Sequence, residues 1–257
     1  MVRIICAVFA LSTLCATLAV AQHSHQADAQ FIPTQLRPLK PPANDIVNVA
    51  FIVSEDTTLI DLAGPWDVFV SAMVTSQGQP WRGGDDMVMP FNLYTVADSE
   101  KPISAEGMKI VPDYTFKNAP IPQVIVIPAQ GGRSDEQKNW VLKNSQTADI
   151  TMSVCTGASI LAAYGLLDHQ TATSHHMFLD KLQSKYPAVQ FVSGLRYIDN
   201  DRVATAAGET SGIDLALHVV ERYYGREIAQ ATADYIEYKG DLWKNPQYGE
   251  VKAVSRK

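Results

Sequence analysis

The stretch TMSVCTGASILAAYGLL, residues 151–167, predicts the feature around which the rest of the chain is arranged. Residues 151–154 favour a strand, Cys155 follows, and a turn of small residues leads into a predicted helix at 158–167. A strand that passes through a nucleophilic side chain and a tight turn into a helix is typical of a nucleophile elbow. The free N–H groups at the helix start favour a thiolate, so the pattern indicates a reactive cysteine. A buried core cysteine is the alternative interpretation.

Length and charge limit the classes of protein to consider. The 257 residues suit one α/β domain or two small ones, and 46% hydrophobic residues are enough for a sizeable core. The formal net charge is -6, and the Lys and Arg residues form no basic run. This balance argues against a nucleic-acid partner.

The first 21 residues read as a signal peptide. Arg3 supplies positive charge, residues 4–18 are apolar, and Ala19-Val20-Ala21 is a cleavage signal. The apolar run is short for a membrane span. We therefore expect cleavage after Ala21, a periplasmic or secreted protein, and no stable membrane insertion after cleavage.

Cleavage changes the cysteine count. Cys6 and Cys15 leave with the signal peptide, so Cys155 becomes the lone cysteine in a compartment that favours disulfides. An unused thiol is an oxidation liability there, which favours a functional Cys155. The alternative for the N-terminus is a lipoprotein anchored through Cys15, which the bulky Leu14 disfavours.

The remaining chain divides into three parts. Residues 22–45 are rich in Pro, Gln and Ala and predict a flexible linker, in which His23 and His25 form at most a loose metal site. Residues 46–240 predict the folded domain, and residues 241–257 predict an irregular tail. The Gly-rich segment 75–86 is either a cover for a pocket or a surface insertion.

Within the domain, strands alternate with helices. Strands are expected at residues 46–53, 91–97, 124–127, 151–154, 189–198 and 202–206, with a hairpin at 103–111. Helices are expected at 134–144 after a capping box, at 158–167, at 213–224 and at 226–238. Two more are expected, one that begins near residue 61 and one that ends at residue 186. This alternation predicts an α/β sandwich with a mainly parallel sheet.

Asp61 is the second candidate site residue. It stands where the first predicted strand gives way to the first predicted helix, just before Pro65. Ligands of open α/β sheets bind at such junctions. An N-capping role for Asp61 is the alternative.

Four stretches together resemble the ThiJ/PfpI superfamily, which has a flavodoxin-like, class I glutamine-amidotransferase-like fold. Within it, the chain is most similar to isonitrile hydratases and to the sensor domains of AraC-type regulators. The matching stretches are IDLAGPWDVF at 60–69, VIVIPAQGG at 124–132, SVCTGASILAAYGLLDHQTATSHH at 153–176 and GETSGIDLAL at 208–217.

The resemblance implies a role for each matching position. Cys155 matches the elbow cysteine, and Asp61 matches the acid that lies against its sulfur. Thr156 matches the threonine that follows the cysteine in isonitrile hydratases. Gly131 and Gly132 match a turn whose backbone N–H groups polarise a substrate atom.

The chain also departs from the superfamily pattern. Thr156 replaces the histidine of the protease-like members, which puts a peptidase triad in doubt. His175 matches a histidine that approaches the cysteine in some relatives; a helix cap is the alternative. Glu209 stands where relatives often carry an apolar residue, and it is either a second site acid or a solvated loop charge.

The resemblance implies a cysteine-dependent hydratase that acts on a small molecule such as an isonitrile, with no cofactor or metal, in a homodimer. The alternative is a non-catalytic small-molecule or thiol sensor. The sequence ends at Lys257 without the basic helix-turn-helix domain of the regulators, so we expect no nucleic-acid partner. A methylglyoxal-type hydrolase and a chaperone rank lower.

Overall fold

The structure is a computed structural model that describes residues 36–43 and 45–255. The predicted signal peptide, residues 1–21, lies outside the described residues, as do His23 and His25 of the predicted linker. Over the described part of the chain, no helix combines the length and the apolar character needed to span a membrane.

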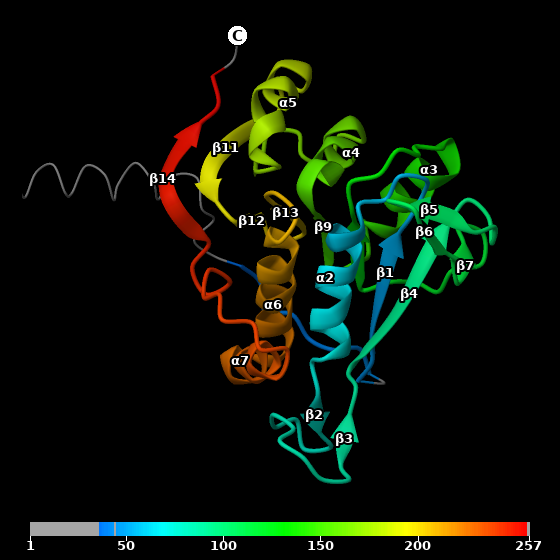
Figure 1. The fold of residues 1–257 in the computed structure, drawn as a ribbon, viewed down its shortest axis with the longest axis vertical. Coiled ribbons are helices and arrows are strands. Elements are labelled where there is room, and N and C mark those ends of the chain that lie inside the picture. Colours follow the sequence, from blue (N-terminus) through cyan, green and yellow to red (C-terminus); the bar gives the residue numbers. More distant parts are fainter. Residues whose placement is uncertain (1–35, 44, 256–257) are drawn as a thin grey trace, which may run out of the picture.

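A seven-stranded sheet forms the centre of the molecule (Figure 1). Neighbouring strands run parallel, except that β12 is antiparallel to β13. In spatial order the strands are β12 (Tyr197–Asp199), β13 (Val203–Ala206), β9 (Ile150–Ser153), β8 (Val124–Ile127), β1 (Val47–Ile52), β4 (Phe91–Ala97) and β7 (Tyr114–Thr115).

Both faces of this sheet are covered because successive side chains of each strand point to opposite sides. In β1, Val49 and Phe51 join one hydrophobic core, and Ala50 and Ile52 join the other. The first core lies under α2 (Leu59–Val70), α6 (Ser211–Tyr224) and α7 (Arg226–Tyr235), and the second under α3 (Asp135–Asn144), α4 (Ala158–Ala163) and α5 (Leu179–Lys185). The predicted three-layer α/β sandwich is therefore confirmed.

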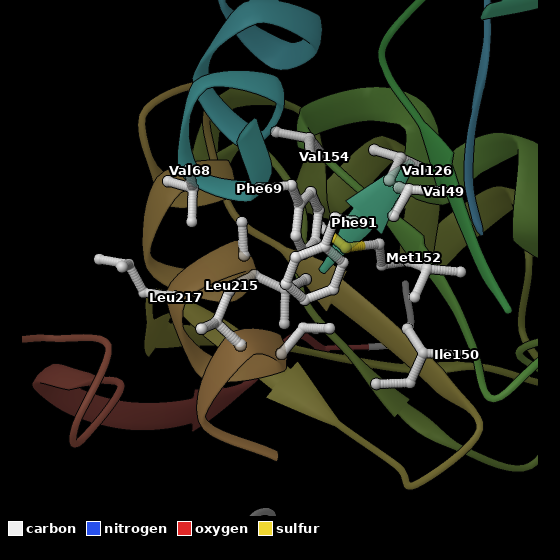
Figure 2. Packing of buried hydrophobic residues seen from close by; sticks show 14 of the residues in the cluster. Val49, Val68, Phe69, Phe91, Val126, Ile150, Met152, Val154, Leu215 and Leu217 are labelled. Atoms are coloured by element: carbon white, nitrogen blue, oxygen red, sulfur yellow. The ribbon is translucent and has the colours of Figure 1, made fainter. Parts of the chain in front are cut away.

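The first core is packed around aromatic rings (Figure 2). Phe69 of α2 and Phe91 of β4 have ring centroids 5.0 Å apart. Val126 and Met152 extend this core along neighbouring strands, and Leu215 of α6 closes it. Burial of each such side chain contributes roughly 1.5–3 kcal/mol, which holds α2 and α6 against the sheet.

Several predicted boundaries are confirmed. Strands β4 and β8 have the predicted bounds, and β5 (Ile103–Ala105) and β6 (Met108–Ile110) form the predicted hairpin. Ser134 caps α3, because its Oγ accepts a hydrogen bond of 3.0 Å from the Gln137 N–H. Helix α4 ends at Ala163, before the predicted 167, and the chain then turns at Gly165 with a φ of 78°.

The single strand predicted at 189–198 is two strands in two sheets. Strand β11 (Gln190–Leu195) lies between β10 (Thr171–Ala172) and β14 (Gln247–Ala253) in a three-stranded sheet, whereas β12 belongs to the central sheet. The chain bends near Gly194, which has a φ of 88° and lies so close to β14 that a Cβ would be 2.4 Å from Glu250 O. Only glycine fits this approach.

The prediction of an irregular tail is wrong for residues 247–253, which form β14 and pair with β11. Trp243, just before it, is 1% exposed in the first core. The end of the predicted flexible linker also packs on the domain. Leu39 is buried in the same core, and Arg37 Nε lies 3.1 Å from Asp201 Oδ2.

The Gly-rich segment 75–86 is an insertion between β2 (Val74–Thr75) and β3 (Met87–Val88), which pair with each other. It follows the C-terminal end of α2, at the bottom of the view in Figure 1. The candidate site instead lies where α2 begins. The surface-insertion interpretation is therefore the correct one.

Candidate active site

The predicted elbow is present after β9. Val154 is extended, and Cys155 opens a single 3-10 turn (Cys155–Gly157) that continues into α4. Cys155 has a φ of 56°, a left-handed conformation that costs a residue other than glycine about 1–3 kcal/mol. Two hydrogen bonds hold it there: its N–H donates to Ala207 O at 2.9 Å, and its carbonyl accepts from Ser174 Oγ at 2.8 Å.

The small residue in the elbow turn has a steric reason. A Cβ on Gly157 would lie 2.2 Å from the carbonyl oxygen of Ile127 and 3.0 Å from that of Pro128. The turn therefore packs directly against the end of β8. This contact positions the turn that carries Cys155 against the end of the strand.

The Cys155 thiol is buried, with 6% of the residue exposed. Burial, and then the nearby charge of Asp61, raise its pKa to about 11, although hydrogen bonds from the backbone N–H groups of Glu209 and Thr156 lower it. The sequence favoured a thiolate at this position, and that expectation is wrong for the resting protein. The helix start does contribute a donor, but burial outweighs it.

Asp61 is fully buried in the first turn of α2. Its Oδ2 accepts a hydrogen bond of 3.0 Å from the Ala129 N–H, and its Oδ1 has no hydrogen-bond partner among the described residues. Burial, followed by the charges of Glu209 and Glu106, raises the pKa of Asp61 to about 7. Thr58, not Asp61, occupies the N-cap, so the capping alternative is wrong.

A pocket of about 400 Å³ opens beside the thiol. Four residues that the sequence singled out line it together: Cys155, Thr156, His175 and Glu209. Asp61 is fully buried and is not on the pocket wall, but its charge acts on the thiol. The structure thus brings the candidate nucleophile, its neighbouring acid and both uncertain candidates to one place.

His175 caps a short turn and also lines the pocket, and its catalytic role stays a prediction. Its Nδ1 accepts a hydrogen bond of 3.3 Å from the Met177 N–H and so caps the 3-10 turn His176–Phe178. This bond places the proton of the neutral ring on Nε2. The ring is held on two sides: it stacks on His176 at 4.6 Å, and it lies so close to Gly208 that a Cβ there would be 2.9 Å from Cδ2.

Gly131 and Gly132 do not reach the pocket. The N–H of Gly131 donates to Glu55 O, and the N–H of Gly132 donates to Ser54 Oγ, both at 2.9 Å. The structure therefore corrects the expected oxyanion role of this turn. The N–H groups that reach the sulfur are those of Thr156 and Glu209.

Glu209 is an exposed loop residue at the edge of the pocket, and its role as a second site acid stays a prediction. Its side chain is exposed, yet it borders the pocket and its charge raises the pKa of Asp61. Its φ of 33° turns its backbone N–H toward the thiol.

The sequence reasoning missed the cations of the pocket, Arg133, Lys181 and Lys185. Lys181 and Lys185 are four residues apart, and this spacing places them on one face of a helix. The sequence shows this four-residue spacing, but it does not show that this face of the helix borders the pocket. No group of three or more His, Cys, Asp and Glu side chains suited to a metal ion occurs within residues 36–43 and 45–255. The expectation of no cofactor stays a prediction.

Comparison with known proteins identifies the family of the chain. The model of the DJ-1/PfpI family matches residues 47–222, which is more than half of the chain. The chain belongs to the DJ-1/PfpI family. The resemblance to ThiJ/PfpI proteins inferred from the sequence is thereby confirmed.

Two curated relatives of this DJ-1/PfpI protein have different functions. Isonitrile hydratase from Pseudomonas putida is 28% identical over 197 residues, which cover 75% of this chain and 78% of that protein. The HTH-type transcriptional regulator GbdR from Pseudomonas aeruginosa is 26% identical over 212 residues. These cover 80% of this chain but only 55% of the regulator, so the chain spans about half of its length.

Solved structures support the fold. A ThiJ/PfpI family protein from Pseudomonas syringae has a TM-score of 0.64 and 26% identity, and the match covers 81% of this chain and 84% of that one. DJ-1beta from Drosophila melanogaster has a TM-score of 0.61 at 14% identity, covering 75% and 98% of the two chains. At that identity, the second match shows the fold alone.

Proposed function

We propose that this DJ-1/PfpI protein is a cysteine-dependent hydratase that adds water to a small electrophile of the isonitrile type. The observation that carries the proposal is the pairing of two buried groups beside one pocket: the Cys155 thiol and the Asp61 carboxyl. The similarity to the Pseudomonas putida isonitrile hydratase supports this choice of substrate.

The pair supplies both a nucleophile and a proton. With Asp61 ionised and Cys155 protonated, the thiol proton passes to the carboxylate as the sulfur approaches the terminal carbon of the isonitrile. The carboxyl group then delivers that proton to the same carbon, and the carbon–sulfur bond gives a thioimidate. Because the pocket holds one mobile proton, no free thiolate is needed in the resting state.

Hydrolysis of the thioimidate completes the reaction. Water adds to the carbon of the C=N bond, and a proton moves to the nitrogen. The carbon–sulfur bond then breaks, the product leaves as an N-substituted formamide, and the sulfur regains a proton. The sum is one isonitrile and one water converted into one formamide, with Cys155 and Asp61 returned to their starting states.

The N–H groups of Thr156 and Glu209 assist the sulfur. They lower the pKa of Cys155, which means that they stabilise negative charge on it. Such charge develops when the thiol loses its proton and again when the adduct breaks down. Fixed donors of this kind need no reorganisation during the reaction.

The test is turnover of an aryl isonitrile by the purified full chain, with the formamide quantified by chromatography. We expect turnover by the wild type, none by Cys155→Ala, and a loss of about 10²–10⁴-fold in Asp61→Asn. Asp85→Asn, which removes an exposed carboxylate from the segment 75–86 outside the pocket, is the matched control and should retain activity. Undiminished turnover by Cys155→Ala would end the proposal.

A second candidate function is ligand sensing without turnover, which the similarity to GbdR favours. The site supports a sensor of small molecules better than a sensor of oxidants, because oxidation requires a thiolate and the pKa of Cys155 is raised. A sensor would bind an isonitrile, seen as a rise in Tm, and release no formamide.

We also propose export to the periplasm or the medium, on the signal-peptide pattern of residues 1–21. Fractionation of cells that produce the full chain with a C-terminal tag, followed by N-terminal sequencing, checks this. A tagged protein that begins at Gln22 outside the cytoplasm supports export. An uncleaved cytoplasmic protein contradicts it.

We also propose that the chain forms a homodimer. An apolar groove of about 670 Å³ lies along α2 and α6, with Trp66, Ile213 and Ile236 in its lining. Grooves of this size and character suit a partner surface, and a second copy of the chain is the partner that the family resemblance implies. Light scattering should give twice the chain mass for the wild type. Ala63→Glu, which adds charge to this lining, should give the chain mass.

A further inference from the structure

The pocket beside Cys155 has a charge opposite to that of the whole chain. The chain carries a formal net charge of -6. The pocket nevertheless has three cations on its wall, Arg133, Lys181 and Lys185, and one carboxylate, Glu209. A cleft lined mainly by one sign of charge concentrates ligands of the opposite sign.

These cations are not neutralised by ion pairs. None of the three takes part in a salt bridge with any carboxylate of the described residues. Arg133 Nη2 donates to Ser159 Oγ at 2.6 Å, and Ser159 itself lines the pocket. Lys185 Nζ lies 5.2 Å from the centroid of the Tyr186 ring. Their charge is therefore available to a ligand.

Two of these cations lie on one short helix. Lys181 and Lys185 are one turn apart on α5 (Leu179–Lys185), and like charges at this spacing destabilise a helix. Between them in the sequence, Leu182 is buried and also lines the pocket, and Phe178 adds a further apolar wall. One pocket wall thus offers apolar contact and two positive charges.

From this arrangement we propose that the substrate is an anionic small molecule, in which a carboxylate group accompanies the electrophilic carbon. The carboxylate is held by Arg133 with Lys181 and Lys185, the apolar body contacts Phe178 and Leu182, and the electrophilic carbon meets Cys155. Arg133 suits a carboxylate because its planar group donates two parallel hydrogen bonds. A volume of about 400 Å³ fits a small ligand. The inference deepens the proposed hydratase function and rests on it for the nature of the electrophile.

The first test needs no turnover. Cys155 is alkylated with iodoacetate, which is anionic, and separately with iodoacetamide, which is neutral, and the modified Cys155 peptide is quantified by mass spectrometry. The ratio of the two rates reports the charge of the pocket. Lys181→Gln/Lys185→Gln should lower this ratio about threefold to tenfold, an effect that fades at high salt.

A matched variant controls for net charge. Lys138→Gln/Lys143→Gln removes two exposed lysines from α3 that do not line the pocket, and it should leave the ratio unchanged. An equal ratio in the wild type and in both variants would overturn the inference. An equal decrease in both variants would do so too, since it would mean that overall charge is responsible.

A second test separates this inference from the proposed function. An aryl isonitrile is compared with the same compound carrying a para-carboxylate. We expect the carboxylate to have the higher kcat/KM and the Lys181→Gln/Lys185→Gln variant to lose that preference. Turnover of the neutral compound alone, with an unchanged alkylation ratio, would contradict the inference and leave the hydratase intact. No turnover of either compound, with a lysine-dependent ratio, would contradict the hydratase and support anion selection.

Discussion

The carboxyl group of Asp61, in the first turn of α2, acts electrostatically on the Cys155 thiol at the end of β9 and raises its pKa. Asp61 has a raised pKa of its own, about 7, because it is fully buried. Two such groups titrate as a pair. Between about pH 7 and about pH 11 the pair holds one proton, on the sulfur, and this is the state from which we expect the reaction to begin.

The pH dependence of catalysis follows from this pair. The reactive state has lost the first proton, with an apparent pKa of about 7, and keeps the second, with an apparent pKa of about 11. We expect kcat/KM for an isonitrile to rise with pH through about 7 and to stay level over the next few pH units. A kcat/KM that falls as the pH rises through 7 would mean that the active state holds both protons, one on Asp61 and one on Cys155.

Asp61 should lower the free energy of unfolding at pH values at which its carboxyl group is ionised. Its pKa rises from an ordinary 3.8 to about 7 on folding, so between these values the unfolded chain has lost a proton that the folded chain keeps. Stability therefore falls as the pH rises across this window and does not recover above it. Asp61→Asn should raise the free energy of unfolding at pH 8 by on the order of 2–4 kcal/mol, and by much less at pH 4.

Denaturant unfolding of Asp61→Asn and the wild type at pH 4 and pH 8 measures this difference. Asp85→Asn, in the exposed segment 75–86, is the control and should show no such dependence on pH. A stability gain for Asp61→Asn that is equal at both pH values would show that burial does not raise the pKa of Asp61.

Gly157 should tolerate no side chain. A Cβ would lie 2.2 Å from Ile127 O, a backbone atom that cannot move without distorting β8. We expect Gly157→Ala to lower the free energy of unfolding by about 2–4 kcal/mol. Gly249→Ala is the control, because the nearest atom to its Cβ is 4.0 Å away. Comparable unfolding midpoints for the two variants would contradict the packing described for the elbow.

The backbone at Cys155 should be strained by its side chain. With a φ of 56°, a Cβ at this position costs about 1–3 kcal/mol that glycine avoids. Both Cys155→Ala and Cys155→Gly remove the thiol, so a comparison of the two isolates the strain. We expect Cys155→Gly to have the higher Tm. If Cys155→Ala proves at least as stable, the left-handed conformation carries no such cost.

The sequence predicted the elements that position the site. The buried β-branched runs at 124–127 and 46–53 identify strands by composition alone. The turn at Cys155 can be predicted because the sequence changes abruptly there from strand to helix character. Strand β14 was missed because it is mostly exposed: in residues 247–253 only Val251 is buried, so the sequence shows no alternation.

The site was predicted less completely than the fold, for reasons that lie in tertiary contacts. Gly131 and Gly132 follow β8 as expected, but Ser54 and Glu55 accept hydrogen bonds from their N–H groups, and nothing in the local sequence indicates that pairing. The thiol was expected to ionise readily from its place before a helix, whereas its pKa depends on burial and on Asp61.

The most direct test of the central claim is mass spectrometry of Cys155 during turnover. The full chain is mixed with an aryl isonitrile, quenched within the first turnovers and digested, and the formamide is measured in the same sample. The account predicts a Cys155 peptide heavier by one isonitrile in the wild type, with no adduct and no formamide from Cys155→Ala. Formamide production by Cys155→Ala at the wild-type rate would contradict the account.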